Sequence, residues 1–378
     1  MLLHGIFTPI TTPFYPDGRV YLKKLEHNVE RYSKTPVAGI AVLGSTGEAI
    51  MLSDEERREV LATARNACAA HKVLLAGTGA ESAVETLRLT EYAAGLGYDV
   101  ALVRTPHFYR PQMQPANLLA FYRTVADHSP IPVLIYSVPV FTNYDMPEEL
   151  IVELAGHPNI IGIKESGGDM EKIRRMAEAT RHIKRRATVT ETFTAVTPRM
   201  LKAKSANAAD ELVPLSALAG VAAENSGASL LRSGEGTRPH AAVAGLTSPS
   251  SSSVEISSGL KTRQKEVGFQ ILAGAAQKLQ PSLEAGAVGG VLAFAGAAPT
   301  ACYEIYAAWK EGDGDLAKLK QERVAKAATR VASQIGIPGL KYALDLNGYY
   351  GGPPRLPLLP PNGDLKAEIE QLMSDLRN

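Results

Sequence analysis

The sequence predicts an α/β protein, a (β/α)8 TIM barrel followed by a C-terminal helical region. The first observation is a series of short runs at nearly regular spacing, apolar on both faces as in parallel strands that helices cover. The second is that helical patterns with recognisable ends lie between these runs, and eight such alternations are typical of the barrel. The predicted strands cover residues 5–12, 39–44, 73–78, 100–106, 132–139, 160–166, 269–275 and 289–294.

Several helices of the predicted barrel have readable ends. Ser53 and Ser82 are each followed three residues later by a glutamate, which is the pattern of a capping box at a helix N-terminus. Gly97 closes the second of these helices, because glycine adopts the left-handed conformation that commonly ends a helix. Proline suits the first turn of a helix, and it marks two later helix starts at Pro147 and Pro299.

The predicted barrel occupies residues 1–300, and residues 301–378 form the C-terminal region, with helices expected around 316–333 and 365–376. An inserted segment, residues 183–265, interrupts the barrel between its sixth helix and seventh strand.

The inserted segment contains a single aromatic residue, Phe193, and ends in a run of serines. This composition supports little packed core. Because the segment joins a helix to the next strand, it should lie on the barrel face opposite the active site and take no part in chemistry. A contact with a partner, or an anomaly of the gene model, remains an alternative interpretation.

Composition excludes several classes of function. The 378-residue chain is 45% hydrophobic and carries a net charge of +1, which gives no electrostatic footprint for nucleic acid or an anionic membrane. No apolar stretch reaches the length of a membrane span, and the N-terminus lacks the features of a signal peptide. We therefore expect a cytoplasmic protein, in which Cys68 and Cys302 form no disulfide framework.

Lys164 ends the apolar run IIGIKES, which spans residues 160–166. Because nearly all residues of this run are aliphatic, most of it should be buried. Burial removes water from the ammonium group and favours the neutral amine, which is able to attack a ketone and form a Schiff base. An isolated lysine at a strand end could equally extend into solvent, so the residues around Lys164 decide between the two interpretations.

Two further motifs end other predicted strands. Tyr136 begins the sequence YSVP at the end of the preceding apolar run, and residues 44–48, GSTGE, follow an earlier one. Together with Lys164, and in the same order, they resemble the motifs of the dihydrodipicolinate synthase/N-acetylneuraminate lyase family, the pyruvate-type class I aldolases.

The resemblance to this family covers about residues 5–182 and 269–357. Within the family, the sequence is most similar to 4-hydroxy-2-oxoglutarate aldolase. The stretches that carry this finer resemblance include KESGGD at 164–169, GIPGLK at 336–341 and GYYGGP at 348–353.

The resemblance implies a role for each matched residue. Lys164 would form the imine with the 2-keto carbon, and Tyr136 would relay protons as the carbinolamine collapses and as the carbon–carbon bond forms or breaks. Adjacent strands lie roughly 5 Å apart, so Tyr136 should reach Lys164. Ser45 and Thr46 would hold the carboxylate of pyruvate, because a carboxylate needs convergent hydrogen-bond donors.

Two more residues complete the expected site. Gly274 would let the substrate approach the backbone after the seventh strand, and Ser166 would bind the distal carboxylate of the substrate. Glu48 is expected to be structural. The resemblance also implies a homotetramer built as a dimer of dimers.

The sequence departs from the family pattern at two positions. Dihydrodipicolinate synthases have an arginine two residues after the proline of the Tyr-x-x-Pro motif, and this position is Phe141 here. The family tyrosine that a neighbouring subunit supplies corresponds to Phe108, which is unable to relay a proton. Tyr109 or His107 could replace it, or the relay could be incomplete.

The main functional hypothesis is a Schiff-base aldolase that cleaves 4-hydroxy-2-oxoglutarate to pyruvate and glyoxylate. The alternatives are 4-hydroxy-tetrahydrodipicolinate (dihydrodipicolinate) synthase, which condenses pyruvate with aspartate semialdehyde, and a non-catalytic ligand-binding barrel. No histidine and carboxylate cluster has metal-ligand spacing, and no glycine motif for phosphate opens a helix after a strand. The expected ligands are therefore pyruvate and an aldehyde, with no metal and no cofactor.

Overall fold

The computed structural model describes residues 1–202 and 260–376. In this part of the chain, eight parallel strands close a barrel in the order β1-β2-β3-β4-β5-β6-β9-β10. Each strand lies within one of the eight predicted runs, which confirms the predicted barrel. The strands are β1 (Gly5–Pro9), β2 (Gly39–Val42), β3 (Val73–Gly77), β4 (Val100–Arg104), β5 (Val133–Ser137), β6 (Ile160–Glu165), β9 (Gln270–Ala273) and β10 (Gly289–Val291).

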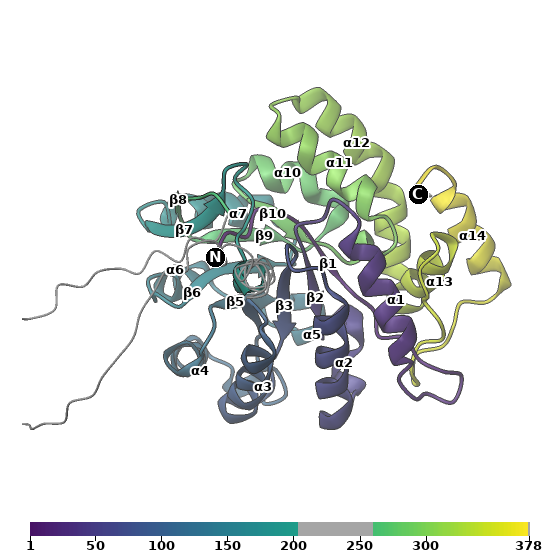
Figure 1. Cartoon of the computed structure of the whole chain (residues 1–378), viewed down its shortest axis with the longest axis horizontal. Helices are drawn as coiled ribbons and strands as arrows, with labels where there is room; N and C mark the ends of the chain where they lie inside the picture. The colour runs from purple at the N-terminus through teal and green to yellow at the C-terminus, as the bar shows by residue number, and fades with distance from the viewer. Residues whose placement is uncertain (203–259, 377–378) are drawn as a thin grey trace, which may run out of the picture. The chain divides into compact units, whose positions relative to one another are not determined.

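Helices surround the strands (Figure 1). The capping box at Ser53 is present, because the Ser53 hydroxyl accepts from the backbone N–H of Glu56 while the Glu56 carboxylate accepts from that of Ser53. Pro147 lies at the N-cap, one residue before the helix that it was predicted to open. The helices of the barrel are α1 (Leu22–Ser33), α2 (Asp54–Ala67), α3 (Ala83–Leu96), α4 (Pro115–His128), α5 (Pro139–Thr142), α6 (Glu148–Ala155), α7 (Met170–Ala179), α10 (Leu279–Glu284) and α11 (Pro299–Lys310).

The C-terminal region shares its core with the barrel. Val324, Leu340 and Met373 belong to the same buried apolar cluster as Ile6 of β1 and Ile40 of β2. The predicted C-terminal helices are present; the first extends further at both ends than the sequence pattern indicated, and the second ends earlier, at Met373. They are α12 (Gly314–Ala327), which continues as a π-helix (Ala328–Ile335), followed by α13 (Ile337–Leu346) and α14 (Gly363–Met373).

The interior of the barrel is a separate apolar cluster to which all eight strands contribute. On β4, Val100 and Leu102 belong to this cluster, whereas Ala101 and Val103 pack outward with residues of α4. Side chains alternate between the two faces of a strand. The next residue of β4 on the interior side is therefore Arg104, the last of the strand.

The two ends of the predicted inserted segment are ordered strands. β7 (Arg185–Thr190) and β8 (Thr262–Val267) pair antiparallel, and Val189 and Val267 pack against Leu2 near the N-terminus. The chain divides into one compact unit of Met1–Met200 with Thr262–Asn378 and a second of Leu201–Lys261. Most of the second unit lies outside the described residues, so the predictions about the middle of the inserted segment are not addressed by the structure.

The chain that follows β7 is fixed to the N-terminal ends of the barrel strands. The Thr197 hydroxyl donates to the carbonyl of Ala70, just before β3, and Arg199 forms a buried ion pair of 3.0 Å with Asp99, just before β4. This beginning of the segment therefore lies at the end of the barrel opposite the carboxyl ends of the strands.

None of the helices in the described part of the chain has the length and apolar character that a membrane span requires.

Candidate active site

Lys164 and Tyr136 lie side by side at the carboxyl ends of two neighbouring strands. Lys164 on β6 is the register partner of Tyr136 on β5. The Lys164 Nζ atom is 3.8 Å from the centroid of the Tyr136 ring, and each residue is 5% exposed. The predicted neighbourhood of the amine and the phenol is thus present in a buried setting at the face where barrel enzymes bind substrate.

The hydroxyl-rich turn after β2 reaches the same phenol. Ser45 and Thr46 lie in a short 3-10 helix, η1 (Ser45–Gly47), and the Ser45 Oγ atom is 3.2 Å from the Tyr136 hydroxyl. Thr46 is buried, and the Thr12 hydroxyl holds the turn by donating to the Gly47 carbonyl at 2.6 Å. Three sequence motifs that are far apart in the chain therefore meet in one cluster of an amine, a phenol and an aliphatic hydroxyl.

Glu48, the residue after this turn, is held by the C-terminal region. It adopts a left-handed backbone conformation with φ 54°, and its carboxylate forms a fully buried ion pair of 2.6 Å with Lys341 of α13. The second carboxylate oxygen accepts from the backbone N–H of Arg355 at 2.8 Å. The Lys341 ammonium also donates to the carbonyls of Thr12 and Pro353, so it connects the turn to the chain after β1 and to the chain after α13. These contacts support the expectation that Glu48 is structural.

We expect Lys341→Met to lower the free energy of unfolding by about 3–5 kcal/mol, because it leaves the buried Glu48 carboxylate without its counter-ion. Urea denaturation followed by circular dichroism measures the change. Lys318→Met is the matched control, since Lys318 is an exposed lysine of α12 and its replacement should cost less than about 0.5 kcal/mol. Equal stabilities of the two variants would contradict an anchoring role for Lys341.

Ser166 and Gly274 meet at the ends of β6 and β9. A Cβ atom on Gly274 would lie 2.0 Å from the Ser166 Oγ atom, so only glycine leaves room for this hydroxyl. The backbone N–H of Gly274 donates to the Glu165 carbonyl at 2.7 Å and that of Ser166 to the Ser137 carbonyl at 3.1 Å. Within the described residues, the buried Ser166 Oγ atom has no hydrogen-bond partner.

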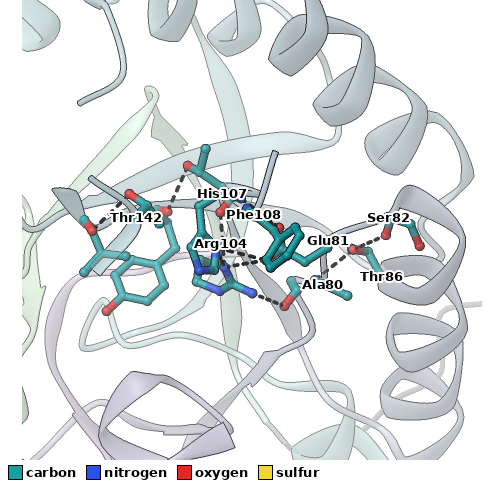
Figure 2. Close-up of polar contacts among 12 residues, drawn as sticks. Ala80, Glu81, Ser82, Thr86, Arg104, His107, Phe108 and Thr142 are labelled. Carbon is teal, nitrogen blue, oxygen red and sulfur yellow. Dashed lines mark hydrogen bonds and ion pairs between the residues drawn. The ribbon is translucent and has the colours of Figure 1, made fainter. Parts of the chain in front are cut away.

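The two predicted relay residues lie on a loop that Glu81 organises. The Glu81 carboxylate accepts from the backbone N–H groups of His107 and Phe108, at 2.8 and 2.9 Å, and pairs with the His107 ring at 2.9 Å (Figure 2). Tyr109 is 68% exposed and stacks edge-to-face on Phe108. Within the described part of the chain, no hydrogen bond or ring contact joins His107 or Tyr109 to Tyr136.

The sequence profile of the Dihydrodipicolinate synthetase family matches residues 2–203 and 249–376, which is most of the chain. The chain belongs to the dihydrodipicolinate synthetase family. The family is one of pyruvate-dependent class I aldolases and lyases, in agreement with the predicted resemblance.

Two curated relatives within the dihydrodipicolinate synthetase family are named 4-hydroxy-tetrahydrodipicolinate synthase. The protein of Xanthomonas axonopodis pv. citri is 42% identical over 173 residues, which are 46% of this chain and 57% of that protein. The protein of Methanoculleus marisnigri is 38% identical over 182 residues, which are 48% of this chain and 62% of that protein. The matched part of this chain thus spans 57% and 62% of the length of these two relatives.

Solved structures of the family share the fold. A dihydrodipicolinate synthase of Bacillus anthracis superposes with a TM-score of 0.73 at 19% identity and covers 100% of both chains. A dihydrodipicolinate synthase of Acinetobacter baumannii, solved in complex with pyruvate, gives a TM-score of 0.71 at 23% identity and covers 99% of both chains. At these identities the likeness concerns the barrel alone.

Arg104 is a charged residue at the carboxyl ends of the barrel strands that was not predicted from the sequence. Arg104 ends β4, and its register partner is Tyr136. Its guanidinium pairs with Glu81 at 3.1 Å (Figure 2). The signal was present in the sequence VALVR, where strand alternation places the arginine on the same side as Val100 and Leu102.

Proposed function

We propose that this protein is a pyruvate-dependent class I aldolase in which Lys164 carries the imine. The observation that supports the proposal most directly is the position of the Lys164 Nζ atom, 3.8 Å from the Tyr136 ring in a buried pair. Tyr136 in turn lies 3.2 Å from the Ser45 hydroxyl, so a proton-transferring group and a carboxylate-binding turn adjoin the amine.

In the proposed reaction, the neutral Lys164 amine attacks the keto carbon of pyruvate, and the carbinolamine loses water to give the imine. The imine accepts electrons when a methyl proton leaves, and the resulting enamine attacks the aldehyde carbon of the second substrate. Tyr136 carries protons to and from the reacting atoms, because it is the phenol whose ring contacts Lys164 Nζ and whose hydroxyl adjoins the Ser45 hydroxyl. Ser45 and Thr46 hold the pyruvate carboxylate through hydroxyl and backbone donors.

The finer proposal is the 4-hydroxy-tetrahydrodipicolinate synthase reaction, the condensation of pyruvate with aspartate semialdehyde. Its support is the name of the relatives, which match this chain at 42% and 38% identity across regions of 173 and 182 residues. This reverses the order of the two enzyme hypotheses drawn from the sequence, where 4-hydroxy-2-oxoglutarate aldolase came first.

Cleavage of 4-hydroxy-2-oxoglutarate is the second candidate, and one observation favours it. Phe141 occupies the position of the arginine that the synthases of the family carry, and it is 59% exposed. A phenyl ring gives no ion pair to the carboxylate of aspartate semialdehyde. Ser166, whose hydroxyl lies beside Gly274 and has no hydrogen-bond partner among the described residues, would then hold the distal carboxylate of 4-hydroxy-2-oxoglutarate, which becomes the carboxylate of glyoxylate.

The two candidates differ in the aldehyde that they accept. We expect kcat/KM for aspartate semialdehyde to exceed that for glyoxylate by roughly 10- to 100-fold, the ratio that one better-placed charge-assisted hydrogen bond, worth about 1.5–3 kcal/mol, would give. The measurement is an initial-rate comparison of the two aldehydes at saturating pyruvate. A higher value for glyoxylate would move the proposal to the second candidate, and failure of both aldehydes would exclude both reactions.

A further inference from the structure

We infer that Arg104 determines the specificity of this enzyme by binding the carboxylate of the aldehyde acceptor. The inference rests on the proposed function, and it concerns a residue on a different strand from the arginine of the family pattern. The chemical class that it selects is a small aldehyde that also carries a carboxylate.

The first step is the lack of a cation after β5. Residues Val140 and Phe141 follow the proline of the Tyr-x-x-Pro motif, and they are 78% and 59% exposed. Neither side chain is able to pair with a carboxylate. A carboxylate that loses water without a hydrogen-bonding partner is costly, so an acceptor of this kind needs a cation from another element of the barrel.

The second step is the position of Arg104. The register pairs Arg104 of β4 with Tyr136 of β5, and Tyr136 with Lys164 of β6. Val100 and Leu102 point into the barrel interior, and alternation along β4 directs Arg104 to the same side. Arg104 and Lys164 therefore flank Tyr136 at one level of the barrel, with each neighbouring pair of strands roughly 5 Å apart.

The third step is the state of the guanidinium. The Arg104 side chain is 18% exposed, so it is largely desolvated while one part remains accessible. Among the described residues, the Nη1 atom of Arg104 contacts the Glu81 carboxylate, the His107 ring and the Thr105 carbonyl, and its Nη2 atom contacts the Gly79 carbonyl. The Nε atom takes part in none of them. A guanidinium has five N–H donors in a fixed fork, so donors remain for a ligand carboxylate.

The fourth step is that Glu81 is satisfied by other donors. Its carboxylate accepts two backbone N–H groups, from His107 and Phe108 (Figure 2). Although burial opposes the change, these backbone donors and Arg104 lower the pKa of Glu81, so its charge is stable. Arg104 is thus oriented by Glu81 without being its only partner. A pre-oriented guanidinium binds a carboxylate with little loss of side-chain freedom.

The test compares Arg104→Gln with the wild type on two kinds of aldehyde at saturating pyruvate. For aspartate semialdehyde and glyoxylate, we expect kcat/KM to fall roughly 10- to 100-fold, mainly through KM, because a charge-assisted contact is lost. For acetaldehyde, which has no carboxylate, kcat/KM should stay within about threefold of the wild type. Arg104→Lys should recover part of the loss, since it keeps the charge and loses the fork.

Arg110→Gln is the matched control, because Arg110 is an exposed arginine six residues after Arg104, and its replacement should leave both kinds of aldehyde unaffected. Equal losses for charged and neutral aldehydes in Arg104→Gln would overturn the inference and show a purely positioning role. An unchanged rate with the charged aldehydes would also overturn it.

Borohydride reduction with pyruvate, read by intact mass, separates this inference from the proposed function. The imine should form in Arg104→Gln as it does in the wild type. A wild type that forms no imine would refute the proposed function and the inference together. An imine in both proteins, with an unchanged preference for charged aldehydes in the variant, would refute the inference alone.

Discussion

Lys164→Ala should abolish turnover, with a loss of at least about 10⁴-fold, because the covalent step that joins pyruvate to the protein disappears. Borohydride added with pyruvate should give a single reduced adduct in the wild type and none in the variant, measured by intact mass and located by peptide mapping. The structural reason is that Lys164 is the buried lysine in contact with the Tyr136 ring. Lys164→Arg should be equally inactive, since a guanidinium stays protonated and is not a nucleophile.

Lys278→Ala is the control for this experiment. Lys278 is an exposed lysine whose ammonium donates to the Gly168 carbonyl in the chain after β6, so it lies in the same region without being buried. Its replacement should leave both the adduct and the turnover intact. A reduced adduct that persists in Lys164→Ala would assign the imine to another lysine and contradict the proposal.

Tyr136→Phe should lower turnover by roughly 10²–10⁴-fold, the usual contribution of a positioned general acid–base group. The phenyl ring keeps its packing over Lys164 and loses the hydroxyl that lies 3.2 Å from Ser45. Pyruvate binding should therefore be retained, and the slow steps should be imine formation and carbon–carbon bond formation. Stopped-flow measurement of imine formation, with steady-state kcat, tests both points.

Tyr109→Phe tests the alternative relay. Tyr109 is 68% exposed and stacks on Phe108, and within the described part of the chain it makes no hydrogen bond or ring contact with Tyr136. A large loss in Tyr109→Phe together with a near-normal rate in Tyr136→Phe would transfer the proton-transferring role to Tyr109.

The strands of this barrel could be predicted from sequence because each is a local, contiguous apolar run. The run predicted at 160–166 contains β6 (Ile160–Glu165), and the run at 132–139 contains β5 (Val133–Ser137). The same locality placed Lys164 and Tyr136 at strand ends, and neighbouring strands of a closed parallel barrel then brought them together.

Contacts between distant segments were beyond sequence reasoning. The ends of the inserted segment were predicted to be part of a core-poor stretch, yet they form β7 and β8, because the two strands pair with each other and their apolar side chains pack on Leu2. The contacts of the Glu81 carboxylate with the backbone N–H groups of His107 and Phe108 likewise join the loops after two different strands. In both cases, the sequence around one segment gives no indication of the segment that it contacts.

The ion pair between Glu48 and Lys341 has a consequence for the order in which this protein matures. A chain leaves the ribosome from its N-terminus, so the GSTGE turn, Tyr136 and Lys164 all emerge long before α13 (Ile337–Leu346). Until α13 folds back onto the barrel, the carboxylate of Glu48 lacks the ammonium that fixes the turn. A nascent or prematurely terminated chain that ends before Lys341 therefore carries all three sequence motifs without the contact that holds the first of them in place.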